Sequence, residues 1–209
     1  RGHVRYSFPR VLPGGKAATT PHDDGMRQLS SPPVSARHMC DWIVEYFHNP
    51  DKPLASVDFL LSEKNVQAPG TTPPYTPPAR TISGPQTAPQ AYSVDLAEVQ
   101  TIAAAAAAWK QRGDDVPGSL LIFYFCGHGI SAGTDYALVA RDYGANPPGK
   151  PFHGLIDFTE FLVGMSDCKS VQQVYFVDAC RSTSEALITA RNYKGDELVQ
   201  AAGDATKGL

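Results

Sequence analysis

The sequence has few of the features that mark specialised classes of protein. Only 19% of the 209 residues are charged, with 18 Lys and Arg against 21 Asp and Glu, and no basic run provides the positive surface of a nucleic-acid binder. No apolar stretch, residues 120–126 included, approaches the roughly 18 residues that mark a membrane span. No basic and apolar leader opens the chain, so we expect neither a signal peptide nor a membrane partner.

Cysteine is also scarce, because the chain has four cysteines and none in a CxxC or similar metal-ligand spacing. Four are too few for a disulfide scaffold at this length, so we expect a reduced, cytoplasmic protein in which each cysteine is either core filler or a reactive thiol. Apolar residues make up 42% of the chain, which is enough for one folded domain with an ordinary core.

Periodicity and turn residues divide the chain into elements. Residues 1–33 are predicted to be an irregular N-terminal arm, and the proline-rich residues 69–89 a long surface loop. The remaining predicted elements are a strand near 4–8, a helix at 36–48 capped by Ser35, a strand at 55–61, a helix from Asp95 to about Arg112 stopped by Gly113, strands at 120–126, 136–140 and 174–179, and a helix at 157–165.

The alternation of helices with strongly apolar strands predicts an α/β fold with a mainly parallel central sheet. The segment 120–126 is continuously apolar, and so is 174–179 apart from Asp178, which is typical of strands buried on both faces. In such a sheet the ligand site lies beyond the carboxyl ends of the strands. The residues that follow these two strands are therefore the first candidates for a functional site.

Both apolar strands end in polar or reactive residues that packing of the core does not require. The first ends in Gly127-His128-Gly129, and the second ends in Asp178, Ala179 and Cys180. If the strands are neighbours, His128 and Cys180 share one crevice, and an imidazole beside a thiol can take its proton and make it a nucleophile. The glycines beside His128 leave room for a substrate backbone and for an N–H group directed at an oxyanion.

This pair of motifs resembles the caspase-like cysteine peptidases, and in particular their bacterial metacaspase-like branch. The histidine and the cysteine are 52 residues apart, close to the spacing of about 50 in the caspase signature. The resemblance implies a caspase-like three-layer sandwich that is incomplete in this chain. It assigns residues 34–183 to a large-subunit (p20-type) catalytic domain and residues 184–209 to a processing linker or activation loop.

The resemblance further implies a cysteine endopeptidase. Cys180 would be the nucleophile, His128 the general acid/base, and the N–H groups of Gly129 and Cys180 the oxyanion hole. Its partners would be a protein substrate, a small p10-like subunit or C-terminal fragment, and a regulatory protein. The spacing of the residues implies no cofactor. The resemblance to metacaspases leaves a calcium requirement open, although no acidic cluster in the sequence matches a calcium-binding loop.

Asp178 bears on specificity, because residues at i and i+2 of a strand point to the same face. The resemblance to metacaspases implies a carboxylate that selects Arg or Lys before the cleaved bond, with Asp95 as a weaker second acid. The alternative is that Asp178 caps the turn after its strand. At the level of function, the alternative is an inactive caspase-like scaffold that binds a partner. A cysteine-dependent α/β hydrolase would need a Gly-x-Cys-x-Gly elbow, which the sequence around Cys180 lacks.

Overall fold

The protein has a mixed α/β fold, seen here in a computed structural model. The described residues are 9–11, 17–21, 29, 31–62, 94–132, 135–143, 152–180, 182–183 and 195–199. The predicted strand at 4–8 and the predicted loop at 69–89 lie outside these residues. No described helix is both long enough and apolar enough to cross a membrane.

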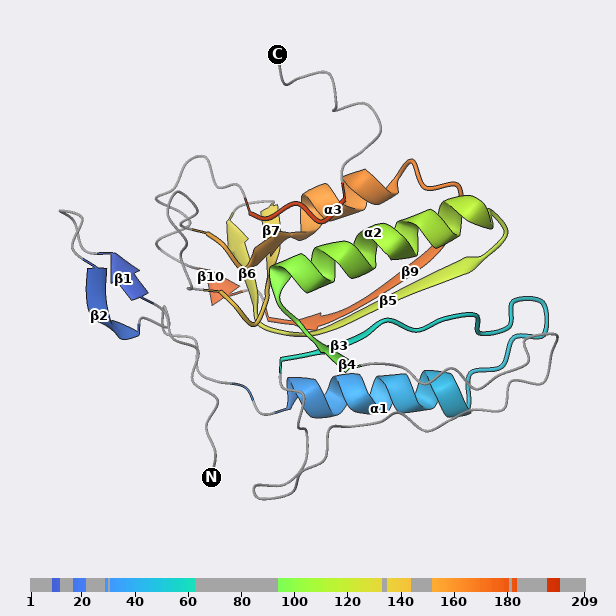
Figure 1. Ribbon diagram of the computed structural model, residues 1–209, viewed down its shortest axis with the longest axis horizontal. Helices are drawn as coiled ribbons and strands as arrows, with labels where there is room; N and C mark the ends of the chain where they lie inside the picture. The colour runs from blue at the N-terminus through green and yellow to red at the C-terminus, as the bar shows by residue number, and fades with distance from the viewer. Residues whose placement is uncertain are drawn as a thin grey trace, which may run out of the picture.

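Two long parallel strands form the centre of the fold. Strand β5 (Leu120–Gly127) pairs with β9 (Gln172–Ala179) over its whole length, from Leu120 opposite Gln172 to Gly127 opposite Ala179. Helices α2 (Val99–Asp115) and α3 (Phe158–Met165) lie on one side of this pair and α1 (Pro32–Glu45) lies on the other (Figure 1). The predicted layers of helix, strand and helix are therefore present.

An aromatic cluster holds the helices α2 and α3 to the strand pair. Its ring centroids lie 5.4 to 6.4 Å apart between neighbours, and each such contact contributes about 0.5–1.5 kcal/mol beyond the area it buries. The cluster joins one α2 residue, one residue of each central strand and two of α3: Trp109, Phe123, Tyr175, Phe158 and Phe161. Phe123 and Tyr175 are register partners, so the cluster holds the middle of the strand pair against the two helices.

The shorter strands form both parallel and antiparallel pairs, so the expectation of a mainly parallel sheet is met only in part. Strands β3 (Phe59–Leu61) and β4 (Val94–Leu96) form a separate parallel pair. Strands β6 (Gly129–Ala132), β7 (Asp135–Val139) and β8 (Leu155–Asp157) form an antiparallel series. Strand β10 (Ser182–Thr183) pairs in parallel with β6. Strands β1 (Pro9–Val11) and β2 (Ala17–Pro21) form a separate antiparallel pair. Only two residues separate β6 from β7, and so short a connection permits only an antiparallel hairpin.

The helix boundaries differ from the sequence expectations for local reasons. Helix α1 begins at Pro32, with Ser31 rather than Ser35 at its N-cap position, because proline fits the first helical turn, where its missing N–H costs nothing. Gly113 does not stop α2 but lies inside it. A Cβ atom there would be 2.8 Å from the Cys168 sulfur, so this glycine allows close packing of the helix.

Asp95 does not open the second helix but lies in β4. Helix α2 begins at Val99, and its first N–H donates to the carboxylate of Asp142 at 3.1 Å. The capping group thus comes from a residue 43 positions further along the chain. A prediction that looks for a cap immediately before the helix cannot find such a partner.

The strand β9 is half-buried on one face and exposed on the other, which corrects the expectation of two buried faces. Its residues alternate in exposure along the whole strand. Tyr175 and Val177 pack into the core beneath α2 and α3, while Val174 and Phe176 on the opposite face are 37% and 47% exposed. Helix α1 lies against β5 and leaves this part of β9 open.

Residues 195–199, within the segment predicted to be a processing linker, pack against the body of the protein. Asp196 forms a parallel bridge with Ile156 on β8, and its carboxylate accepts a hydrogen bond from the N–H of Gly154 at 2.9 Å. The same carboxylate lies 3.3 Å from Nδ1 of His153. Leu198 is buried in the main core, so at least these five residues are part of the fold.

Candidate functional site

His128 and Cys180 lie together at the carboxyl ends of β5 and β9. The last register pair of the two strands is Gly127 opposite Ala179, so the next residue of each strand stands beside the other. The Cys180 sulfur is 3.9 Å from Nδ1 of His128. That distance is somewhat longer than a catalytic hydrogen bond, and such bonds commonly tighten only when substrate binds. The predicted juxtaposition of the two side chains is therefore present.

Cys180 is the one exposed thiol among the four cysteines, all of which are described. Burial raises the pKa of Cys40 to about 12. Burial also raises the pKa of Cys126 and of Cys168 above the ordinary value. These three thiols remain protonated at neutral pH and are poor nucleophiles. Exposure and an adjacent imidazole distinguish Cys180 from all of them.

Gly129 lets β6 approach Cys180 closely. A Cβ atom at this position would be 2.3 Å from the carbonyl oxygen of Cys180, so any side chain would push the two segments apart. The carbonyl of His128 accepts a hydrogen bond from the N–H of Val139 on β7 at 3.0 Å. Because carbonyl and N–H groups of a trans peptide point in opposite directions, the Gly129 N–H is directed away from β7, and the strand on that other side of β6 is β10.

Asp178 stands on the exposed face of β9, two residues before Cys180. The thiol of Cys126, its register partner on β5, lies 3.5 Å from one carboxylate oxygen. Burial raises the pKa of Cys126, and its contact with Asp178 raises that pKa further, so the thiol stays protonated and donates. Among the described residues this thiol is the hydrogen-bond partner of Asp178, and no capping of the following turn is seen in that part of the chain.

Asp95, the weaker candidate for a second acid, is exposed and belongs to the β3 and β4 pair. It occupies the middle of β4, where it is opposite Leu60 of β3. No described contact joins Asp95 to Cys180 or His128. In the described ranges, no group of three or more His, Cys, Asp or Glu side chains is arranged to hold a metal ion.

Tyr136 belongs to the surroundings of Cys180 and was missed by the sequence reasoning, which took it only as the start of a strand. Its hydroxyl lies 3.4 Å from the carbonyl oxygen of Ala179 and 3.3 Å from that of Cys180. No local signal in the sequence links a tyrosine to a cysteine 44 residues later. Only the pairing of β7 with β6, and of β6 with β10, brings the two together.

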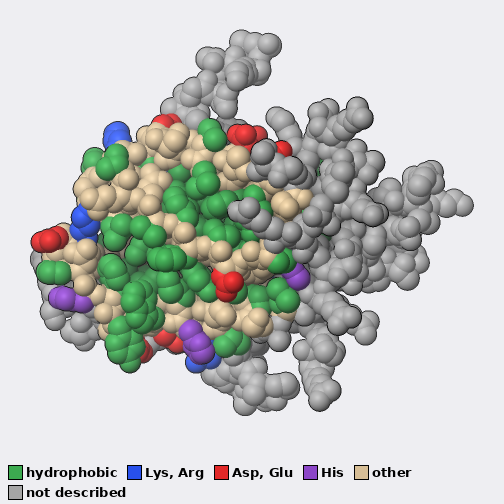
Figure 2. Space-filling view, turned by 180° about the vertical axis from the view of Figure 1, so that it is seen from behind, with side chains coloured by type: hydrophobic (Ala, Val, Ile, Leu, Met, Phe, Trp, Pro, Cys, Tyr) green, Lys and Arg blue, Asp and Glu red, His purple; other side chains and the backbone are tan. Residues whose placement is uncertain are grey.

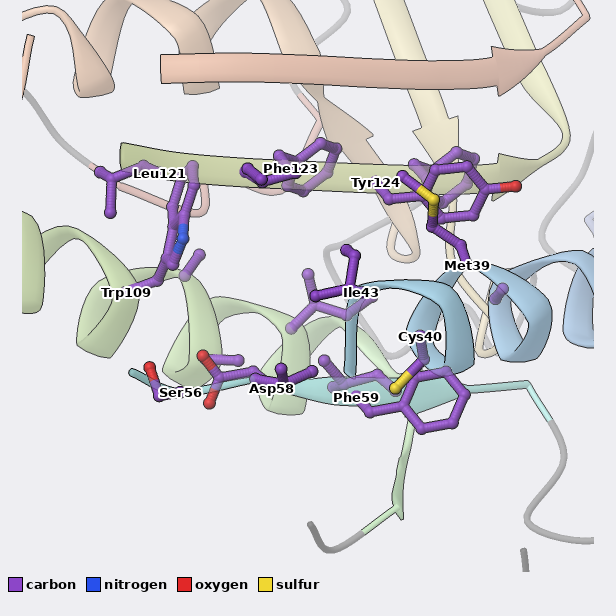
Figure 3. A pocket seen from close by; sticks show the side chains of 18 of the residues that line it. Met39, Cys40, Ile43, Ser56, Asp58, Phe59, Trp109, Leu121, Phe123 and Tyr124 are labelled. Carbon is purple, nitrogen blue, oxygen red and sulfur yellow. The ribbon is translucent and has the colours of Figure 1, made fainter. Parts of the chain in front are cut away.

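A large cavity lies beside the central strands and apart from the Cys180 and His128 pair. Its volume is about 760 Å³, and its lining comes from α1, α2, β3 and β5. Figure 3 shows β5 and β3 on opposite sides of this cavity, with Ile43 of α1 projecting into the space between them. Residues of β3 line it, whereas residues of β4 do not.

Comparison with known proteins adds one relative of unknown role. No family model matches the chain, and no solved structure matches it significantly. The chain is similar to the uncharacterized protein y4kE of Sinorhizobium fredii (strain NBRC 101917 / NGR234), with 31% identity over 144 residues. The match covers 69% of this chain but 36% of that protein, so the chain spans about a third of the length of the curated relative it matches.

Proposed function

We propose that this chain is the large-subunit portion of a caspase-like cysteine endopeptidase that cleaves after Arg or Lys. The observation that carries the proposal is the 3.9 Å separation of the Cys180 sulfur and Nδ1 of His128 at the ends of two paired parallel strands. Further support comes from the other three thiols, whose raised pKa values leave Cys180 as the reactive one.

Acylation is the first half of the proposed reaction. His128 accepts the thiol proton, and the Cys180 sulfur attacks the carbonyl carbon of the scissile peptide bond. The carbonyl oxygen becomes an oxyanion that accepts hydrogen bonds from the N–H groups of Gly129 and Cys180. His128 then gives its proton to the leaving amine. The C–N bond breaks, and the amino-terminal part of the substrate remains as a thioester on Cys180.

Deacylation restores the enzyme. A water molecule gives a proton to His128 and attacks the thioester carbonyl, through a second oxyanion at the same two N–H groups. The C–S bond breaks, the carboxylic acid leaves and the proton returns to Cys180. The side chain before the cleaved bond lies beside Asp178 during both halves, so a cationic Arg or Lys is attracted and an acidic side chain is repelled.

We also infer that further polypeptide completes the fold, as a small subunit or another segment of a longer chain. Among the described strands, β9 pairs with β5 alone and β5 with β9 alone. An unpaired strand edge beside exposed apolar side chains favours addition of a further strand. Val174 and Phe176 provide such side chains next to the edge of β9, and Figure 2 shows apolar side chains gathered over the described surface.

A cleavage profile on a peptide library tests the activity and the specificity together. We expect the assembled wild-type protein to cut after Arg and Lys, and the Cys180→Ala and His128→Ala variants to be inactive while keeping the wild-type thermal midpoint. Activity that survives in Cys180→Ala would overturn the assignment of the nucleophile. A wild-type protein that binds partners but cuts no peptide would favour the inactive scaffold.

Native purification of the polypeptide in its own host tests the second inference. A smaller fragment or second chain is expected to copurify with residues 1–209, and to be lost when Val174 and Phe176 are replaced by Ser. A monodisperse and fully active 22.5 kDa chain would exclude this inference, while leaving the assignment of Cys180 intact.

A further inference from the structure

The hydroxyl of Tyr136 contacts the backbone carbonyl groups of Ala179 and Cys180. It lies 3.4 Å from the carbonyl oxygen of Ala179 and 3.3 Å from that of Cys180, so one O–H group is shared between two acceptors. Each bond is long and weak when taken alone. Together they place a single donor directly behind the peptide that joins Ala179 to Cys180.

The position of Tyr136 is itself well fixed. Its ring makes an edge-to-face contact with Phe158, with centroids 6.2 Å apart and planes at 89°, and Phe158 belongs to the aromatic cluster of the core. Its backbone N–H donates to the hydroxyl of Thr159 at 3.4 Å. Gly129 leaves the space that the phenol needs, because a Cβ atom there would be 2.4 Å from the Tyr136 hydroxyl oxygen. The hydroxyl is thus presented from a rigid part of the fold.

Peptide geometry connects this contact with the proposed chemistry. No described peptide bond is cis, so the Cys180 N–H points away from the Ala179 carbonyl that faces Tyr136. A hydrogen bond accepted by that carbonyl fixes the plane of the peptide. It also polarises the peptide and makes its N–H a stronger donor. The bond from the Val139 N–H to the His128 carbonyl does the same for the Gly129 N–H on the other side of the site.

We propose that Tyr136 is a positioning residue that orients and polarises the Cys180 N–H group, so that this group stabilises the oxyanion. The proposal rests on the proposed peptidase function and adds a residue that acts on one step of it. The formation of the thiolate depends on His128 and does not involve Tyr136. Loss of the Tyr136 hydroxyl should therefore weaken oxyanion stabilisation and leave the nucleophilicity of Cys180 unchanged.

The test compares two reactions of the same sulfur in Tyr136→Phe. Hydrolysis of an Arg-containing peptide passes through an oxyanion, whereas alkylation by iodoacetamide at Cys180 displaces iodide and forms none. Removal of an oxyanion donor costs about 10²–10³ in kcat. Because Tyr136→Phe keeps the donor and loosens only its orientation, we expect kcat to fall about 10-fold, with KM, the alkylation rate and the pH profile of kcat all close to wild type.

Tyr175→Phe is the matched control. It also removes one phenol hydroxyl, which donates to Gln173 at 2.6 Å, and among the described residues no hydrogen bond joins that hydroxyl to Ala179 or Cys180. We expect its kcat to stay at the wild-type value. Equal kcat values in the two variants would overturn the proposal. An equal loss of hydrolysis and alkylation in Tyr136→Phe would also overturn it, because it would show general disorder of the site.

The amide resonance of Cys180 gives a readout that does not need activity. A lost hydrogen bond at the preceding carbonyl should shift the ¹⁵N resonance of Cys180 in Tyr136→Phe but not in Tyr175→Phe. If the wild-type protein hydrolyses no peptide, the proposed function fails while this shift still tests the contact. An unshifted resonance refutes the role of Tyr136. If Tyr136→Phe does not fold, 3-fluorotyrosine at position 136 is the second variant, because its hydroxyl is a stronger donor. It is expected to shift the ¹⁵N resonance of Cys180 in the opposite direction. An unshifted resonance would refute the role of Tyr136 in this case as well.

Discussion

The carboxylate of Asp178 offers the sharpest test of specificity, because its contribution can be worked out from its place two residues before Cys180, the proposed nucleophile. A carboxylate about 4 Å from a cation is worth about 4 kcal/mol at an effective dielectric constant near 20. Asp178 is exposed, so solvent screening removes a good part of this. If half remains, about 2 kcal/mol separates a cationic from a neutral side chain, which corresponds to about 30-fold in kcat/KM.

The assay pairs the variant Asp178→Asn with two fluorogenic peptides that end in Arg or in its neutral isostere citrulline. Wild type is expected to prefer Arg by about 30-fold, and the variant to lose most of this preference, with the citrulline peptide changed less than about threefold. Comparing all four rates isolates the charge interaction from any general loss of activity.

Asp115→Asn is the matched control, because it removes the same charge at the last residue of α2, before the start of β5 and away from the site. It should leave the Arg preference unchanged. If Asp178→Asn keeps the wild-type ratio of Arg to citrulline, the cation is recognised by other residues. A wild-type preference for an acidic residue would refute the reasoning entirely.

Three further predictions concern the same elements. Gly129→Ala should reduce hydrolysis more than 100-fold, since its Cβ would be 2.3 Å from the Cys180 carbonyl oxygen. A crystal structure of this variant should show the β6 backbone displaced. Wild-type activity in the variant would contradict the close approach of Gly129 to Cys180. Limited iodoacetamide at neutral pH should modify Cys180 first, because burial raises the pKa of the other thiols, and peptide mapping that finds another cysteine first would be inconsistent with this order. The pKa of Cys40 is raised from 9.0 to about 12, so its contribution to stability is complete below pH 9 and is lost as the pH rises toward 12. Urea denaturation should show that, between about pH 8.5 and 10.5, Cys40→Ala loses about 1–2 kcal/mol less unfolding free energy than the wild-type protein. Equal losses in the two proteins would refute this prediction.

The strongest elements of the fold could be predicted because local sequence determines them. The apolar runs that form β5 and β9 have no competing helical period, and Asp157 caps α3 through the N–H of Glu160, three residues later. The positions of His128 and Cys180 followed from the same two strands, since parallel neighbours end at one edge of a sheet.

The rest depended on partners far along the chain. The start of α2 is set by Asp142, and the orientation of the Cys180 backbone by Tyr136. The exposure of one face of β9 reflects where α1 lies. These partners lie far in the sequence from Asp95, Cys180 and Phe176. Neither the start of α2 nor the surroundings of the Cys180 thiol could therefore be predicted from neighbouring residues.

The pairing of His128 with Cys180 is the central claim, and the rate at which iodoacetamide alkylates Cys180 at pH 7 tests it without any knowledge of the substrate. Because the imidazole stabilises the thiolate, we predict that His128→Ala lowers this rate at least about tenfold while the thermal midpoint is unchanged. Equal alkylation rates in the wild-type protein and in folded His128→Ala would show that the histidine does not activate the thiol, and would contradict the proposed mechanism.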